Sequence, residues 1–256
     1  FGLEGGAFAL FTALIVLLGT WEWTNLAGIT QTVQRAQSVA VVAVLMLIMW
    51  LMGAATAIWP LWLAAAGWLL NLFWVARYPA AGEQWQASVR RLAMGLWVLL
   101  PCWVGFNVLR ESGMAWLLFV LLLVWCADVG AYFVGRAWGK RKLAPHVSPG
   151  KSWEGVYGGL ATTALLAIVF AVGLSLDMAG SLTLILVTAI VTLTSVLGDL
   201  LESMLKRHRN IKDSSQLLPG HGGVLDRIDS LTAAIPLFAL FYLEVLVPVL
   251  AQGQAL

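Results

Sequence analysis

The sequence predicts an all-α, polytopic transmembrane protein with about eight spans, on three observations. Apolar residues make up 61% of the 256 positions and charged residues only 11%, whereas roughly a quarter of a soluble domain is charged. Apolar stretches of about 20 residues, long enough to cross a bilayer, recur along the chain. Lys and Arg gather in the connections between these stretches. No segment is left that could form a soluble domain of ordinary size.

Hydrophobicity predicts helices near 5–21, 39–57, 61–76, 92–109, 114–134, 156–175, 182–200 and 230–250. The connections at 58–60, 110–113 and 176–181 are short, and those at 22–38, 77–91, 135–155 and 201–229 are longer and polar. Long and short connections alternate, so they lie on opposite faces. We divide the chain into N-terminal transmembrane helices (1–110) and a C-terminal transmembrane region (111–256) that contains the loops 135–155 and 201–229.

The distribution of basic residues predicts the orientation in the membrane. The longer connections carry fourteen of the fifteen Lys and Arg residues, and the opposite face has only Arg110. The positive-inside rule therefore places the longer loops in the cytoplasm and both ends of this chain outside. Because the chain starts at Phe1 on the outer face, we expect a ninth helix upstream. A signal peptide over 5–21 is the alternative, disfavoured because no basic flank precedes it.

Each of the two longest loops follows a predicted helix with an aspartate near its end, Asp128 in one case and Asp199 in the other. A carboxylate near the hydrocarbon costs on the order of 3 kcal/mol, so such residues usually face a polar cavity and a partner. Both are candidate site residues. For Asp128 the alternative is an interfacial carboxylate that simply reaches water.

The segment 198–207 is predicted to continue the seventh helix into the cytoplasm. Asp199, then Glu202 or Ser203, then Lys206 recur there at three- and four-residue steps, so one face would carry an acid, a hydroxyl and an ammonium group. Taken alone, the pattern is more typical of a salt-bridge ladder on a solvated helix.

The loop that follows changes this interpretation. Residues 219–223 contain one Pro and three Gly, which exclude a regular helix and let backbone amides approach a ligand. Asp226 and Asp229 lie one turn apart if the last helix begins near Leu225. Carboxylates for a hard divalent cation, basic side chains for phosphate oxygens and an open backbone are typical of phosphoryl or nucleotidyl transfer.

Three further features are weighed against plainer explanations. Gly150-Lys151-Ser152 lacks the preceding glycine and strand of a Walker site, although Lys151 can still contact a phosphate. His221, between glycines, is interpreted as a phosphate or substrate contact, with a turn residue as the alternative. A basic cluster is interpreted as a topology signal or anionic-lipid contact; it comprises Arg136, Lys140, Arg141 and Lys142.

One extended motif resembles the signature of phosphatidate cytidylyltransferases. It reads Ser203-x-Leu205-Lys206-Arg207, four residues, Lys212-Asp213, then Pro219-x-His221-Gly222-Gly223-Val224-x-Asp226-Arg227-Ile228-Asp229. The stretches 128–132 and 148–155 are also similar to that family, and the resemblance covers about residues 120–240. It implies a magnesium-dependent enzyme of the bacterial inner membrane that joins CTP to phosphatidic acid, giving CDP-diacylglycerol and pyrophosphate.

Site roles follow from this resemblance and from residue chemistry. Asp199 and Asp226 are the expected ligands of Mg²⁺, with Asp229 and Asp128 as second-rank ligands and a second cation left open. The expected catalytic residues are Asp199, Lys206, Arg207, Lys212, Asp213, His221, Asp226 and Arg227. The expected substrate-binding residues are Ser148, Lys151, Ser203, Gly222 and Gly223.

The expected partners are CTP, phosphatidic acid and membrane lipids, without nucleic acid, and a homodimer is left open. Two rival functions use the same charged residues. A CTP-dependent lipid kinase or other lipid phosphotransferase would share the carboxylates and release a different product. An ion-coupled transporter could use Asp128, Asp199 and Glu244, but the charges gather on one face and the spans show no inverted repeat.

Overall fold

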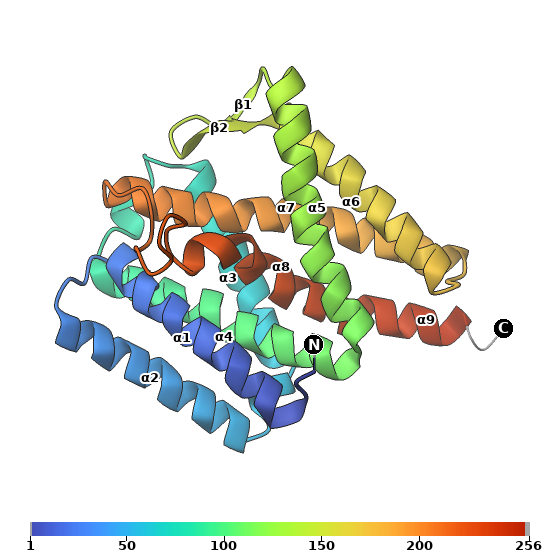
Figure 1. Cartoon of the computed structure of the whole chain (residues 1–256), viewed down its shortest axis with the longest axis horizontal. Helices are drawn as coiled ribbons and strands as arrows, with labels where there is room; N and C mark the ends of the chain where they lie inside the picture. The colour runs from blue at the N-terminus through green and yellow to red at the C-terminus, as the bar shows by residue number, and fades with distance from the viewer. Residues whose placement is uncertain (1, 254–256) are drawn as a thin grey trace.

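The computed structural model describes residues 2–253, which form a helical protein with one small β-hairpin (Figure 1). Within that range eight helices are long and apolar enough to cross a membrane, which confirms the predicted all-α polytopic class. The elements are α1 (Gly5–Leu26), α2 (Thr32–Leu51), η1 (Ala54–Thr56), α3 (Trp59–Ala76), η2 (Gly82–Gln84), α4 (Ser88–Ser112), α5 (Met114–Trp138), β1 (Lys142–Ala144), β2 (Ser148–Ser152), α6 (Trp153–Gly173), α7 (Met178–His208), α8 (Leu225–Phe241), η3 (Tyr242–Leu246) and α9 (Val247–Gly253). The chain is an integral membrane protein.

The first long connection is shorter than predicted. Instead of spanning 22–38, it is confined to residues 27–31, because α1 continues to Leu26 and α2 begins at Thr32. The polar residues there find partners inside the helical structure. The Arg35 guanidinium donates to the Trp21 carbonyl (2.8 Å) and to Thr24 Oγ1 (2.9 Å), and it lies 4.0 Å from the Trp21 ring centroid. Hydropathy alone ended α1 too early and began α2 too late.

The seventh helix confirms its predicted continuation and extends it. α7 runs to His208, and its last turn carries Lys206 and Arg207, whose positive charges favour a helix C-terminus. Asn210 then adopts a left-handed conformation with φ 53°, which ends the helix. The glycine-rich loop is therefore 209–224 rather than 201–229, and α8 begins at Leu225, five residues before the start at 230 that hydropathy predicted.

The predicted loop 135–155 is partly ordered as a hairpin. β1 and β2 pair antiparallel, with Lys142 opposite Ser152. The Glu154 carboxylate accepts hydrogen bonds from the backbone amides of Lys140 and Arg141, both at 3.1 Å, and pairs with the Arg141 guanidinium at 3.0 Å. Ser152 caps α6 by accepting from the Gly155 amide. The hairpin is thus anchored to the first turn of α6.

Close helix contacts determine where the hairpin sits. α5 and α6 form the most extensive helix pair. At Gly158 an added Cβ would lie 2.6 Å from the Gly130 carbonyl oxygen and 2.5 Å from Val134 Cβ, so the two backbones approach closely. The Thr162 hydroxyl donates across this contact to the Cys126 carbonyl at 2.8 Å.

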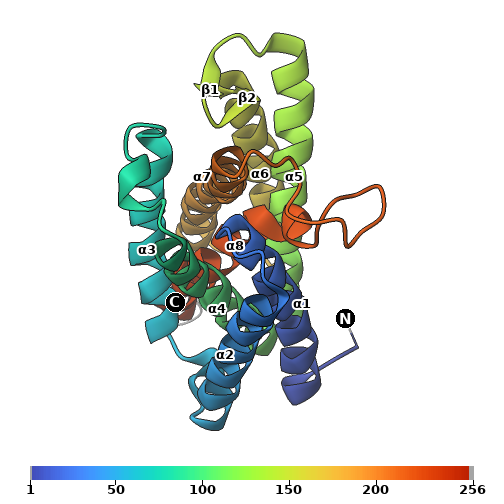
Figure 2. The ribbon, with the colours of Figure 1, turned by 90° about the vertical axis from the view of Figure 1, so that its left-hand side faces the viewer.

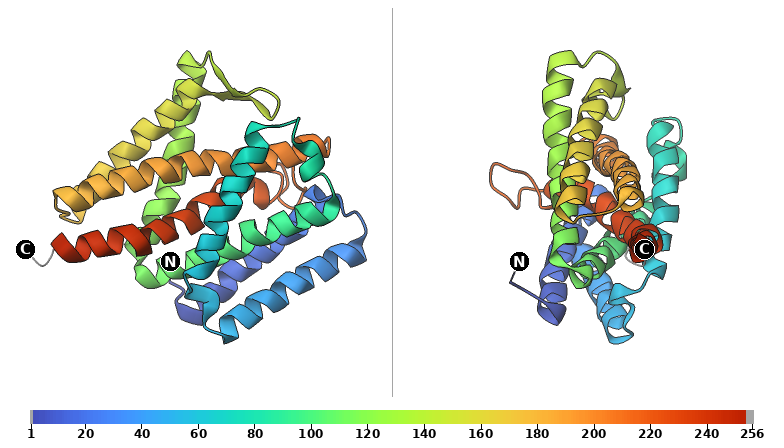
Figure 3. Two further views of the ribbon diagram at one scale, coloured as in Figure 1. Left: turned by 180° about the vertical axis from the view of Figure 1, so that it is seen from behind. Right: turned by 90° about the vertical axis from the view of Figure 1, so that its right-hand side faces the viewer.

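α8 is the central helix of the bundle. Its residues from Ala233 to Leu240 are all buried, and it packs against α4 and α7, with α3 crossing both α7 and α8 as seen from behind (Figure 3). Because α1 and α4 also contact α8, the N-terminal helices share a core with the C-terminal region. The first turn of α8 therefore lies where both halves of the chain meet.

The four connections that were predicted to be longer gather on one side of the molecule. In Figure 1 the segments 27–31, 77–87, 139–152 and 209–224 lie toward the upper left, and the turns at 52–58, 113 and 174–177 lie toward the opposite side. The view from the left side shows the hairpin and the loop 209–224 projecting from the helices (Figure 2). This arrangement brings the two loops with candidate site residues to the same side.

Candidate active site

Asp226, in the first turn of α8, is a carboxylate that accepts hydrogen bonds from four donor groups. Its Oδ2 accepts the Gly223 amide (2.7 Å), the Ser214 amide (3.0 Å) and the Ser214 hydroxyl (2.9 Å). Its Oδ1 accepts the Lys206 ammonium at 2.7 Å. These bonds tie the glycine-rich loop, α7 and α8 together at one side chain.

Lys206 lies between acidic groups of two helices. Its Nζ is 2.7 Å from Asp226 Oδ1 and 3.4 Å from Glu202 Oε2, one turn earlier on α7. The Glu202 side chain is only 2% exposed, and Asp229 of α8 is close enough to interact electrostatically with both Glu202 and Lys206. One ammonium group therefore faces three carboxyl groups.

A second lysine reaches the site from the hairpin. Lys151 on β2 places its Nζ 2.7 Å from Asp199 Oδ2 on α7, and the Ser203 hydroxyl donates to Asp199 Oδ1 at 3.1 Å. The predicted helical face is thus confirmed: Asp199, Ser203 and Lys206 follow one another along α7. Both side chains of the Lys151 pair are about 30% exposed or less, so the pair borders solvent.

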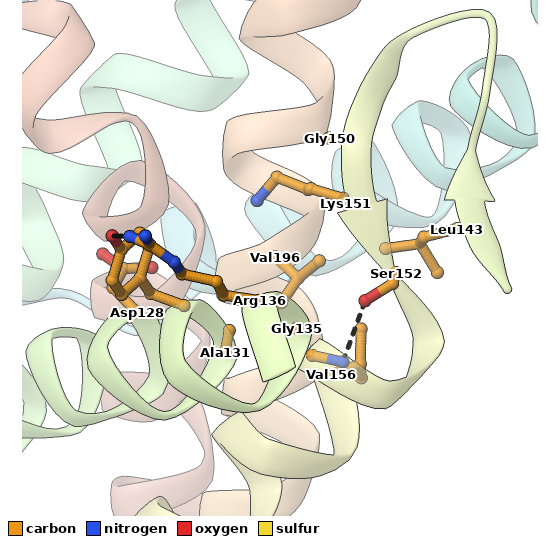
Figure 4. A pocket seen from close by; sticks show the side chains of 12 residues that line it. Asp128, Ala131, Gly135, Arg136, Leu143, Gly150, Lys151, Ser152, Val156 and Val196 are labelled. Carbon is orange, nitrogen blue, oxygen red and sulfur yellow. Dashed lines mark hydrogen bonds between the residues drawn. The ribbon is translucent and has the colours of Figure 1, made fainter. Parts of the chain in front are cut away.

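Two adjoining pockets open beside this pair. A polar pocket of about 380 Å³ lies between α5, the hairpin, α6 and α7, and Figure 4 shows Asp128 and Arg136 on α5 and Lys151 extending from β2 into it. An apolar pocket of about 490 Å³ lies on the α3 side and is lined by Leu72, Leu193 and Leu197 among others. Leu143, Val156 and Val196 line both pockets, so they form a shared wall.

The charged centre is the cluster formed by Asp199, Ser203, Lys206, Asp226, Asp229 and Lys151. Several other predicted site residues lie on the surface around it. Lys212, Asp213 and His221 are exposed on the loop 209–224. The Arg227 guanidinium donates to the His221 carbonyl at 2.5 Å and so holds that loop. The Arg207 guanidinium donates to the Val147 carbonyl at 3.2 Å, which connects α7 to the hairpin.

Ser148 also lies apart from the charged centre. It occupies the start of β2 opposite Ala144, whereas Gly150, Lys151 and Ser152 line the polar pocket. The structure thus brings Asp199, Ser203, Lys206, Asp226, Asp229 and Lys151 together, with Asp128 across the pocket.

The two central glycines allow close backbone approach. Gly222 has φ +82°, and a Cβ there would lie 2.8 Å from Asp226 Oδ2. A Cβ at Gly223 would overlap the Ser214 hydroxyl and lie 2.6 Å from Glu22 Oε1. The Gly223 amide donates a hydrogen bond to Asp226, so the glycines allow the loop backbone to pack directly against the carboxylates.

The carboxylates have the donor chemistry of a magnesium site. Oxygen ligands from Asp and Glu suit Mg²⁺, and the buried Glu202 carboxyl faces the Lys206 ammonium at 3.4 Å without a closer hydrogen-bond donor. Over residues 2–253, however, no three His, Cys, Asp or Glu side chains are grouped to hold one ion. Instead, Asp199 pairs with the ammonium group of Lys151, and Asp226 pairs with that of Lys206.

The sequence analysis missed three residues that organise this centre. Ser214, fully buried, donates to Asp226, and Glu22 and Asn25 of α1 both contact the segment 214–225. A buried acid in an apolar helix was the signal used for Asp128 and Asp199. It was available for Glu22 as well, but Glu22 was assigned to a connection.

Comparison with known proteins identifies the family of this chain. The Cytidylyltransferase family matches residues 2–245. A phosphatidate cytidylyltransferase of Pseudomonas aeruginosa is 54% identical, over 93% of this chain and 89% of its own length. Those of Haemophilus influenzae and Brucella suis are 43% and 35% identical, each over 93% of this chain and over 91% and 84% of their own lengths. The chain therefore belongs to the cytidylyltransferase family.

Proposed function

We propose that this protein transfers the cytidylyl group of CTP to phosphatidic acid, giving CDP-diacylglycerol and pyrophosphate for phospholipid synthesis. The observation that carries the proposal is membership of the cytidylyltransferase family across nearly the whole chain, with relatives named phosphatidate cytidylyltransferases. The charged centre on α7 and α8 is the expected place of reaction.

The paired pockets support one polar and one lipid substrate. The polar pocket carries Lys151 and Arg136, which suit phosphate oxygens, and the apolar pocket beyond the shared wall suits an acyl chain. CTP would enter from the cytoplasm, and the lipid phosphate would lie at headgroup level. A lateral opening between the helices toward the cytoplasmic leaflet follows from this proposal.

The reaction needs no covalent enzyme intermediate. A phosphate oxygen of phosphatidic acid attacks the α-phosphorus of CTP in line, and the bond from that phosphorus to the oxygen bridging to the β-phosphate breaks as pyrophosphate leaves. The nucleophile is already anionic, so the protein has to position two polyanions and balance developing charge. Lys151 and Lys206 occupy the centre, while Arg207, Lys212 and Arg227 are proposed phosphate contacts at its rim, with Ser148, His221, Gly222 and Gly223 as substrate contacts.

Asp199 and Asp226 are the proposed ligands of Mg²⁺, with Asp229 and Asp128 as second-rank ligands and Asp213 as an additional catalytic carboxylate. The ion would neutralise phosphate charge and polarise the reacting phosphoryl group. It would compete with the Lys151 and Lys206 ammonium groups for the same carboxylate oxygens. Those two lysines would then be free to bind substrate phosphates.

The location proposed for this chemistry is the cytoplasmic side of a bacterial inner membrane. The relatives named above are bacterial, and basic residues gather on the side of the longer loops. The rival lipid kinase or phosphotransferase would release CDP instead of pyrophosphate, which makes the released product the discriminating observation.

The test is transfer of label from [α-³²P]CTP to phosphatidic acid by purified protein in detergent with magnesium. The wild type is expected to form labelled CDP-lipid and pyrophosphate, with ATP inactive as donor. Asp226→Asn is expected to reduce turnover by about a thousandfold, on the scale of losing a group that acts in the transition state. Glu111→Gln, which removes an exposed carboxylate at the far end of α4, is the matched control and should retain activity.

Folded wild-type protein that labels no lipid with CTP, or that releases CDP, would refute the proposed reaction. An Asp226→Asn variant with full turnover would leave the reaction intact and refute the role of Asp226.

A further inference from the structure

Glu22 is a fully buried carboxylate in the apolar helix α1, and its donors all come from the other end of the chain. Oε1 accepts the Ser215 hydroxyl at 2.6 Å and the Val224 amide at 2.9 Å. Oε2 accepts the Leu225 amide at 2.5 Å and the Ser214 hydroxyl at 3.2 Å. The side chain is 0% exposed, so this hydrogen bonding replaces solvation by water.

These donors are the segments that form the charged centre. The Val224 and Leu225 amides stand at the N-terminus of α8, where helix amides lack intrahelical partners and favour a negative charge. Asp226, the next residue, therefore has its backbone position set from α1. The Ser214 hydroxyl lies between Glu22 Oε2 and Asp226 Oδ2, so the two carboxylates share one hydroxyl neighbour.

Asn25 and Gly223 also take part in the contact between α1 and the loop 209–224. Asn25, one turn after Glu22 on α1, donates to the Ser214 carbonyl at 2.9 Å and accepts from the Arg209 guanidinium at 3.1 Å through its own carbonyl. Gly223 lets the loop backbone reach Glu22, since a Cβ there would lie 2.6 Å from Oε1. The same face of α1 thus holds both ends of the loop 209–224.

We propose that Glu22 is a positioning residue for the transfer reaction: it fixes the loop 209–224 and the first turn of α8 on α1 and thereby sets Asp226 relative to Lys206. The inference rests on the proposed function. It assigns a part in turnover to the N-terminal helices, outside the motif at 203–229. Glu22 touches neither Lys206 nor the polar pocket, so it acts through Ser214 and the backbone at 223–225.

Glu22→Gln is the main test, because glutamine keeps the size of the side chain but places an amide N–H₂ among hydrogen-bond donors. We expect kcat to fall by at least about tenfold, as when a group that orients a site ligand is removed, while KM for CTP and for phosphatidic acid changes less than about twofold. Glu244→Gln, an exposed glutamate after α8, is the matched control and should keep wild-type kcat.

Amide hydrogen exchange separates positioning from general stability. Glu22→Gln should accelerate exchange in residues 213–225 and leave α3 and α6 unchanged, with rates normalised to folded protein from size-exclusion chromatography. A purely structural role predicts faster exchange throughout and a kcat that returns to the wild-type value after normalisation.

Ser215→Ala keeps the inference falsifiable if Glu22→Gln does not fold. It removes a single donor to Glu22, and we expect a loss of about threefold in kcat with unchanged KM values. Suppose that the wild type forms CDP-lipid. A folded Glu22→Gln variant with full kcat then overturns the inference and leaves the proposed function standing. If Glu22→Gln is unfolded, full kcat in Ser215→Ala has the same meaning. A wild type that forms no CDP-lipid overturns the proposed function itself.

Discussion

Lys151 and Lys206 each hold an aspartate at 2.7 Å, but burial separates their energetic roles. Lys206 and its partners Glu202 and Asp226 are 16%, 2% and 9% exposed, whereas Lys151 and Asp199 are 27% and 30% exposed. Breaking a buried pair leaves an uncompensated charge, while a solvated pair contributes little. The two lysines should therefore be distinguishable by experiment.

Lys206→Met should destabilise the protein by about 3 kcal/mol, because it leaves the carboxylates of Glu202 and Asp226 without their shared counter-ion. Thermal unfolding in detergent measures the change. Lys140→Met, at an exposed position of the hairpin loop, is the control. Equal unfolding temperatures for the two variants would contradict the assigned role of Lys206.

Lys151→Met should change turnover much more than stability. The loss in stability should stay below about 1 kcal/mol, because solvent already screens the Lys151 to Asp199 pair. Turnover should nevertheless fall by about a hundredfold if Lys151 contacts substrate phosphates in the polar pocket. The measurement is kcat/KM for CTP beside the unfolding temperature. Unchanged kcat/KM would remove Lys151 from the proposed substrate contacts.

At this scale the sequence predicts local relations well. The three- and four-residue steps of Asp199, Ser203 and Lys206 correctly predicted one helical face. Asp226 and Asp229 lie on the next helix, whose start hydropathy had placed five residues too late. The contact of Glu22 with Val224 joins residues about 200 positions apart. No helical or strand period connects such residues, so only the folded chain reveals that contact.

The packing of α5 against α6 determines where the hairpin places Lys151 in the site. The hairpin that bears Lys151 lies between these helices in sequence and is anchored to α6 by Ser152 and Glu154. Its distance from α7 therefore depends on how closely α6 can approach α5, which the small residues at that contact allow.

Gly158→Ala should cost about 2 kcal/mol, since the new methyl group would overlap backbone at Gly130 and the Val134 side chain. Activity should fall as well, because the hairpin would shift with α6. Gly173→Ala, near the end of the same helix, has open space around its Cβ and should be neutral or slightly stabilising. Unfolding temperatures of the two variants test the contact, and equal values would contradict it.

The hairpin could not be predicted from sequence periodicity. β1 and β2 have three and five residues, and their residues are mostly polar or small, so no alternation of apolar side chains marks them. Hydropathy predicted the spans reliably, since the bilayer requires length and apolarity. It failed at helix ends such as 22–26 and 32–38, where polar side chains are satisfied by tertiary partners.

On the scale of the whole molecule, the predicted division at residue 110 cuts through shared contacts. α1 and α4 pack on α8, and Glu22 holds the loop that precedes α8. The resemblance noted in the sequence analysis began near residue 120, whereas the family match over residues 2–245 also includes the first 110 residues. In the folded protein they provide one wall and one support of the charged centre.

The orientation of the molecule in the membrane gives the last prediction. The hairpin loop and the loop 209–224 should face the cytoplasm, because CTP is made there and the basic residues gather on that side. Single cysteines at Lys140→Cys and at Met52→Cys, both exposed, report the two sides after Cys102 and Cys126 are changed to Ala. In spheroplasts a membrane-impermeant maleimide should label position 52 only, and inside-out vesicles should label position 140 only. The reverse pattern would place the charged centre away from its nucleotide, and the proposed route of CTP would then be wrong.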